Sequence, residues 1–133
     1  MILATGLVCA FATAAAARTI YECSFEDMAV NRNWLPTTVI IGYEAGSDVA
    51  EVNDNIIQSV NEGPMSIAIK RDTDAQLGLN WELDLESTMG RSLVMRYDFT
   101  YLKLQGFAKI KGTVHGGSTR GFVAQGDCKV SKG

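Results

Sequence analysis

The stretch from Leu77 to Tyr101 decides the fold: it contains LGLNWELDL over residues 77–85 and LVMRYDFTY over residues 93–101. Every second residue of both segments is apolar or aromatic, which is the period of a β-strand with one buried face. A turn between the two segments makes them a hairpin, and a slip of one residue would turn its apolar side chains to water, so the register is well specified. The expected pairs are Leu85 with Leu93, Leu83 with Met95, Trp81 with Tyr97 and Leu79 with Phe99, with Glu82 opposite Arg96 on the outer face.

The next segment, Phe107 to His115, extends this hairpin into a third strand. Large residues of one strand then face small residues of the other, which is what a filled interior needs and argues against a wide ligand cavity. The expected pairs are Phe99 with Ala108, Tyr97 with Ile110 and Met95 with Gly112, with Asp98 opposite Lys109 outside.

Short alternating segments separated by turn residues continue over the rest of the chain, and no helical period of useful length occurs. The sequence therefore predicts an all-β fold, a small antiparallel meander that closes into a roughly eight-stranded barrel, with a two-layer β-sandwich as the alternative. The candidate strands are Arg18 to Phe25, Thr37 to Glu44, Asp48 to Val52, Ile56 to Val60, Met65 to Arg71, Leu77 to Glu86, Ser92 to Leu102, Phe107 to His115 and Thr119 to Lys129.

Residues 1–17 are uncharged in their side chains and run from an apolar segment, Ile2 to Ala12, into a series of alanines that ends just before Arg18. This pattern is typical of a cleavable signal peptide. An uncleaved membrane anchor is the alternative, because the stretch is at the short end of what spans a bilayer. We expect cleavage, a single domain over residues 18–133, a periplasmic or secreted location and no membrane span in the mature protein.

Two cysteines remain after cleavage, Cys23 near the start of the domain and Cys128 near its end. In an exported chain such a pair predicts a disulfide bond that ties the first strand to the last. Closing a loop of about 105 residues is worth roughly 4 to 5 kcal/mol on the chain-entropy model. Two reduced thiols or a metal site are the alternatives, and a single histidine offers few companion ligands for a metal.

Charge is divided unevenly along the chain. Residues 18–86 hold 13 acidic and 4 basic side chains, whereas residues 87–133 hold 2 acidic and 8 basic ones. Lys109, Lys111 and His115 would form a basic outer stripe for an anionic surface or an acidic extracytoplasmic protein. The interpretation we favour from the sequence is a solvated face that pairs with acids on adjoining strands. Nucleic acid is a poor candidate, because the chain carries a net charge of −3.

A second candidate for partner binding is the loop that holds Arg32 and Trp34. Tryptophan and arginine dominate binding hot spots, so this loop could present an exposed anchor. The other interpretation, which we favour, is that the indole plugs one end of the barrel.

The sequence offers no catalytic constellation, and we expect no enzyme, no cofactor and no metal site. His115 stands next to Gly116, Gly117 and Ser118, but two glycines between strands are expected of a tight turn. The nucleophile-elbow spacing Gly-x-Ser-x-Gly is missing.

Several short motifs resemble those of uncharacterised small exported proteins of alphaproteobacteria: Tyr21-Glu22-Cys23, Trp34-Leu35-Pro36, Asn55-Ile56-Ile57, Glu62-Gly63-Pro64, Trp81-x-Leu83, Arg96-Tyr97 and Gln125-Gly126-Asp127-Cys128. That family has no assigned activity, so the resemblance implies export and a disulfide. The chain is more distantly similar to the bacterial inhibitors of chicken-type lysozyme, which are eight-stranded barrels with a Tyr-x-Cys start. It lacks their Ser-Gly-x-x-Tyr loop.

These observations together favour a monomeric, non-catalytic exported binding or accessory module. The alternatives are an inhibitor of a secreted hydrolase such as lysozyme and a carrier of a small apolar ligand.

Overall fold

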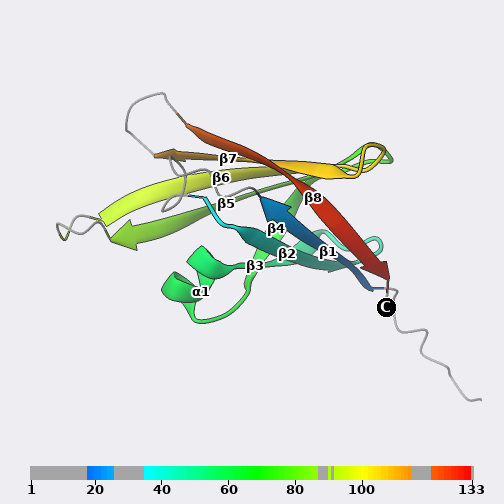
Figure 1. The fold of residues 1–133 in the computed structure, drawn as a ribbon. Coiled ribbons are helices and arrows are strands. Elements are labelled where there is room, and N and C mark those ends of the chain that lie inside the picture. Colours follow the sequence, from blue (N-terminus) through cyan, green and yellow to red (C-terminus); the bar gives the residue numbers. More distant parts are fainter. Residues whose placement is uncertain (1–17, 26–34, 87–89, 91, 115–120, 133) are drawn as a thin grey trace, which may run out of the picture.

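A computed structural model describes residues 18–25, 35–86, 90, 92–114 and 121–132 of the chain. Within these residues eight antiparallel strands follow one another round a closed barrel, in which β8 pairs with β1 (Figure 1). The closed ring confirms the predicted barrel, and the sandwich alternative is not observed. The strands are β1 (Arg18–Phe25), β2 (Thr38–Glu44), β3 (Val49–Asp54), β4 (Met65–Asp72), β5 (Gln76–Glu86), β6 (Ser92–Leu102), β7 (Phe107–Val114) and β8 (Phe122–Lys132), with helix α1 (Asn55–Asn61) between β3 and β4.

The hairpin of β5 and β6 has the predicted register. Trp81 is paired with Tyr97, and their rings stack with centroids 5.8 Å apart. Glu82 is opposite Arg96 on the outer face, where Glu82 Oε1 lies 3.2 Å from Arg96 Nη2. The alternation of apolar and polar residues specifies this pairing because only one phase buries the rings.

The predicted register of the next hairpin, β6 with β7, is wrong by two residues. The connection is a turn of four residues, Lys103 to Gly106, in which the N–H groups of Gln105 and Gly106 donate to the Leu102 carbonyl and Gly106 takes a φ of +80°. A shift of two keeps every side chain on its expected face and changes only its partner. The observed pairs are Tyr101 with Ala108, Phe99 with Ile110 and Tyr97 with Gly112, and Asp98 faces Lys111 rather than Lys109.

The strand expected over Ile56 to Val60 is wrong, because these residues belong to helix α1. The Asp54 carboxylate caps the helix by accepting hydrogen bonds from the N–H groups of Ile56 and Ile57, at 2.8 and 2.7 Å. Glu62 ends it in the left-handed conformation, with a φ of 55°. The local caps therefore outweigh the strand preference of the branched residues.

Several strand ends also differ from the expected ones. β3 continues past Val52 to Asp54, which pairs with Val39 of β2. β8 runs from Phe122 to Lys132 rather than from Thr119 to Lys129, whereas β7 is described from Phe107 to Val114 and the expected last residue, His115, lies outside the described residues. The extra residues of β8 pair with the start of β1, which lengthens the seam that closes the barrel.

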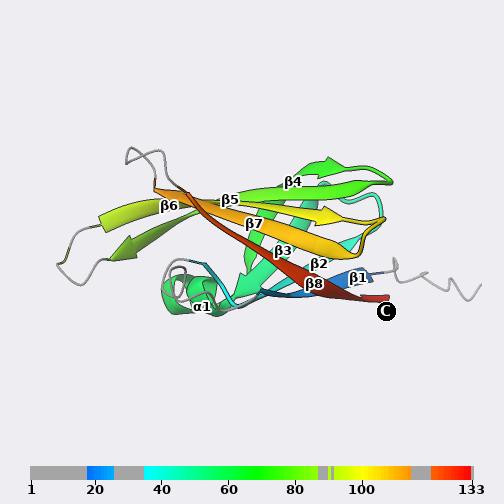
Figure 2. The same ribbon diagram turned by 45° about the horizontal axis from the view of Figure 1, so that its top comes forward.

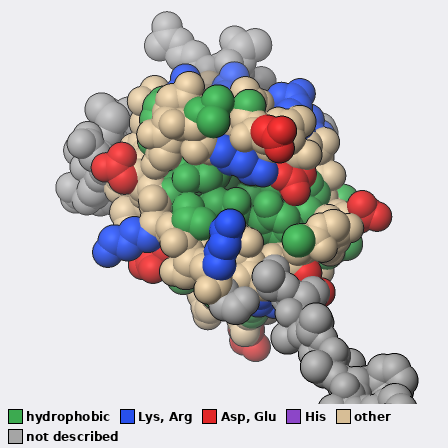
Figure 3. Space-filling model, turned by 90° about the vertical axis from the view of Figure 1, so that its right-hand side faces the viewer, with side chains coloured by type: hydrophobic (Ala, Val, Ile, Leu, Met, Phe, Trp, Pro, Cys, Tyr) green, Lys and Arg blue, Asp and Glu red, His purple; other side chains and the backbone are tan. Residues whose placement is uncertain are grey.

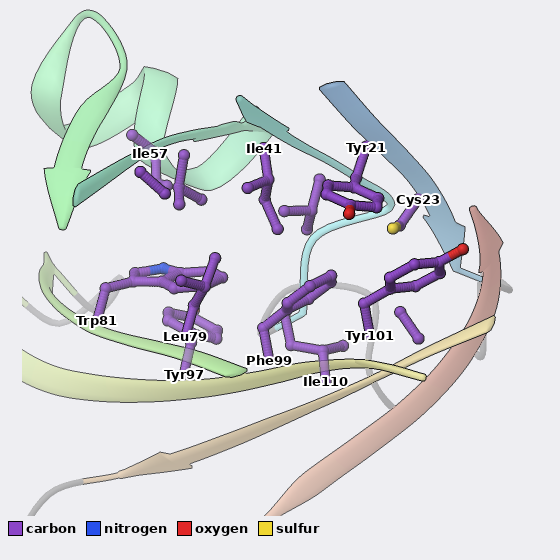
Figure 4. Packing of buried hydrophobic residues seen from close by; sticks show 14 of the residues in the cluster. Tyr21, Cys23, Ile41, Ile57, Leu79, Trp81, Tyr97, Phe99, Tyr101 and Ile110 are labelled. Carbon is purple, nitrogen blue, oxygen red and sulfur yellow. The ribbon is translucent and has the colours of Figure 1, made fainter. Parts of the chain in front are cut away.

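Side chains fill the barrel interior. Figure 4 shows Trp81, Tyr97 and Phe99 on one side facing Ile41 and Ile57 on the other. A Cβ atom at Gly112 would lie 3.0 Å from a Leu35 methyl carbon, so that position has no spare room. The buried apolar residues are Tyr21, Cys23, Phe25, Leu35, Val39, Ile41, Tyr43, Ala50, Val52, Ile57, Leu77, Leu79, Trp81, Leu83, Met95, Tyr97, Phe99, Tyr101, Ala108, Ile110 and Ala124.

The predicted disulfide is present between Cys23 of β1 and Cys128 of β8. The two cysteines are directly paired in the ladder that closes the barrel, with Cα atoms 4.0 Å apart. The bond spans 105 residues of sequence and joins the first strand to the last. It therefore fixes the seam at which the barrel would otherwise open.

The two ends of the barrel differ. One end, which we name the short-turn end, carries the β2–β3, β4–β5 and β6–β7 turns and the last residues of β8. Helix α1 lies toward the opposite end (Figure 2). Within the described residues, no helix has the length and apolarity needed to cross a membrane.

Candidate functional site

The residues predicted to bind a partner are only partly placed by the structure. Lys109 and Lys111 are exposed on the outer face of β7, as their alternation with buried Ala108 and Ile110 requires. Arg32, Trp34 and His115 lie outside the described residues, so the structure does not bring them together with the two lysines.

The neighbours of the two lysines are mostly uncharged. Lys109 lies opposite Thr100 of β6 and Gln125 of β8, and its Nζ atom lies 6.0 Å from the centre of the Phe107 ring. Lys111 lies opposite Asp98 of β6. Among the described residues, no carboxylate comes within 4.0 Å of either ammonium group. Both ammonium groups are therefore available to an anion.

A shallow groove of about 340 Å³ lies beside these lysines, over the seam of β1, β7 and β8. Its lining is mainly polar, and Phe107 connects it to Lys109. A Cβ atom at Gly126 would lie 2.7 Å from the carbonyl carbon of Ser24 and 3.0 Å from Cα of Phe25, so the two strands approach closely here. The residues that line the groove are Ser24, Phe107, Gln125, Gly126 and Asp127. We call this groove together with Lys109 and Lys111 the β7 face.

A second candidate site is a cluster of tyrosines at the short-turn end. The Tyr21 ring lies 6.0 Å from that of Tyr43 and 4.8 Å from that of Tyr101, measured between centroids. Figure 3 views this end of the molecule and shows hydrophobic side chains at its centre with charged ones lying across them. Lys103 and Asp72 form an ion pair at this end, with Nζ and Oδ1 2.6 Å apart.

The tyrosine cluster lies within electrostatic reach of this ion pair. Burial raises the pKa of Tyr21 from 10.0 to about 12, and hydrogen-bond donation to Tyr43 adds to the rise. Burial also raises the pKa of Tyr43; the contact with Tyr21 opposes this rise, and the negative charge of Asp72 adds to it. Both hydroxyls therefore stay protonated near neutral pH. The Asp72 carboxylate forms the ion pair with Lys103 and also interacts with Tyr43. This network satisfies buried polar groups and offers no free base for chemistry.

The opposite half of the barrel holds a buried carboxylate, Asp54. Burial raises the pKa of Asp54, and the hydrogen bonds from the Ile57 and Ile56 backbone oppose the rise. Burial raises the pKa of Tyr97, and the negative charge of Asp54 raises it further. Because the Asp54 carboxylate accepts hydrogen bonds from two backbone N–H groups, it acts as a helix cap.

The described residues contain no group of three or more His, Cys, Asp or Glu side chains placed to hold a metal ion. Sequence reasoning missed the tyrosine cluster, although Tyr21, Tyr43 and Tyr101 share the inward phase of their strands. The missing information was the closure of the barrel, which brings Tyr21 of β1 and Tyr101 of β6 together across the interior.

The chain was compared with protein-family models, curated proteins and solved structures, and nothing matched in any of the three.

Proposed function

We propose that this protein is an exported, non-catalytic binding module that contacts an acidic extracytoplasmic partner or surface through its β7 face. The observation that carries the proposal is the pair of exposed lysines beside a polar groove, without a carboxylate in ion-pair distance among the described residues. Two lysines on the same face of one strand stand about 7 Å apart, which suits adjacent anionic groups.

The interior supports contacts on the outside of the barrel. Tyrosine, phenylalanine, leucine and isoleucine side chains fill the centre, and a methyl group added at Gly112 would meet Leu35, Met95 and Tyr97. A carrier of an apolar ligand would need room in this space. The interior therefore favours a surface binder over a carrier.

The disulfide supports export. Such bonds form and persist in oxidising compartments, and here the bond joins the two strands that close the fold. The signal-peptide pattern of residues 1–17 also predicts an oxidising compartment outside the cytoplasm.

A charge-reversal experiment tests the proposed function. The variant Lys109→Glu/Lys111→Glu is compared with Lys70→Glu/Lys132→Glu, which changes the net charge equally at two other exposed lysines. Each protein is immobilised and exposed to the extracytoplasmic fraction of the host, and the bound material is identified by mass spectrometry. We expect the β7 variant to lose a partner that the wild type and the control both retain. Equal retention by all three proteins would contradict the proposal.

A further inference from the structure

The hairpin of β5 and β6 extends beyond the strands on either side of it (Figure 1, Figure 2). The pairing of β4 with β5 covers only Leu77 to Leu79 of β5. The pairing of β5 with β6 continues from there to Glu86. Within the described chain, the residues from Asn80 to Glu86 therefore have β6 as their ladder partner on one side and an unpaired edge on the other.

This edge carries different chemistry on its two faces. Trp81 and Leu83 point inward, each with 4% of its surface exposed, and Leu85 is half-buried beside them. Glu82 and Asp84 point outward and are exposed. Glu82 is paired with Arg96, whereas Asp84 lies opposite Val94 and has no ion-pair partner among the described residues. One side of the edge is thus apolar and the other acidic.

An unpaired strand edge presents a row of backbone donors and acceptors that can take up an added strand. A second copy of β5 is a poor candidate for that strand. In the antiparallel registers that place apolar face beside apolar face, acids oppose acids, for example Asp84 with Asp84, Glu82 with Asp84 or Glu82 with Glu82. Like charges directly opposite each other are destabilising, and the remaining registers set apolar side chains beside acids.

We propose that the free edge of β5 binds an extended segment of a partner protein in which basic and apolar residues alternate. The backbone of the segment pairs with the edge from Asn80 to Glu86. Its apolar side chains lie on the same face as Leu83 and Leu85, and its basic side chains lie beside Asp84 and Glu82. This edge is distinct from the β7 face, so either proposal can fail while the other holds.

The probe is a synthetic nine-residue peptide that alternates lysine with valine, and the matched control replaces each lysine by glutamate. Amide hydrogen exchange of the full-length mature protein is followed residue by residue with and without peptide. Alternate residues of a strand direct their N–H groups to the same edge. We therefore expect every second amide between Asn80 and Glu86 to exchange at least tenfold more slowly with the lysine peptide and at an unchanged rate with the glutamate peptide.

Two variants link the protection to the acids of the edge. Asp84→Lys should weaken binding of the lysine peptide roughly two- to tenfold, because it replaces an attractive cross-strand pair by a repulsive one. Asp74→Lys makes the same charge change in the β4–β5 turn and should leave binding unchanged. The inference is overturned if the glutamate peptide binds equally well, if protection appears on β7 or β8 instead, or if the protein protects the same amides by dimerising without peptide.

Discussion

Replacement of Gly126 by alanine should force β1 and β8 apart at the seam that closes the barrel. The added Cβ would collide with the backbone carbonyl of Ser24, whose carbon lies 2.7 Å away, and with Cα of Phe25 at 3.0 Å. Backbone atoms cannot rotate aside as a flexible side chain can. An ordinary contact between carbon atoms needs about 3.5 Å, so the strands would have to separate locally by roughly 1 Å.

The cost of this separation follows from two terms. Overpacking costs about 1 to 3 kcal/mol, and stretching one or two ladder hydrogen bonds adds about 1 kcal/mol. We therefore expect the Gly126→Ala variant to lose about 3 kcal/mol of unfolding free energy. At about 4 °C for each kcal/mol in a domain of this size, its Tm should fall by roughly 12 °C.

Thermal and urea unfolding, followed by circular dichroism under oxidising conditions, measure the loss. Gly63→Ala is the matched control, because no atom lies within 4 Å of its added Cβ and its φ is not positive. That variant should be neutral or stabilised by up to about 1 kcal/mol. If Gly126→Ala unfolds with the same midpoint as Gly63→Ala, the close approach of β1 and β8 is wrong.

Three further predictions concern the buried polar groups and the disulfide. Because the folded pKa of Tyr21 is raised from 10.0 to about 12, its contribution to stability is complete below pH 10 and is lost as the pH rises through about 12. Alkaline unfolding monitored by tyrosinate absorbance should therefore begin at a higher pH in Tyr21→Phe, and an unchanged onset would refute this role. Asp54→Ala should cost about 1 to 2 kcal/mol through loss of the helix cap, whereas Asp54→Asn keeps an acceptor. Because the pKa of Asp54 is raised in the folded protein, the unfolding free energy of the wild type falls as the pH rises through that pKa. Asp54→Asn does not titrate, so its stability relative to the wild type should improve over the same pH range. Urea titrations at several pH values measure the difference in unfolding free energy between the two proteins, and a constant difference would exclude this effect. Cys23→Ser/Cys128→Ser should lower the unfolding free energy by roughly 4 to 5 kcal/mol, and a loss below about 1 kcal/mol would show that the bond does not constrain the unfolded chain.

The sequence was sufficient for features that depend on the phase of alternation. The period of two in β5 and β6 leaves one register that buries Trp81 and Tyr97 together, and the structure has that register. It was not sufficient for the β6–β7 partners, because a register shift of two residues buries the same side chains. The length of the turn decides between such registers, and Gly106 alone does not specify that length.

Helix α1 shows a second limit. Ile56, Ile57 and Val60 are strand-forming residues, and only the capping carboxylate of Asp54 and the reversal at Glu62 indicate a helix. The site was predicted only in part for a related reason. Strand phase places Lys109 and Lys111 outside, but the groove beside them depends on the pairing of β8 with both β1 and β7.

The central claim is a disulfide-closed barrel with a filled interior that makes its contacts on the outside. Native mass spectrometry of the protein purified from its host tests this claim most directly. We expect the mass of the mature polypeptide without its two thiol hydrogens and without any bound small molecule. An additional mass of a few hundred daltons that is released on denaturation would contradict it.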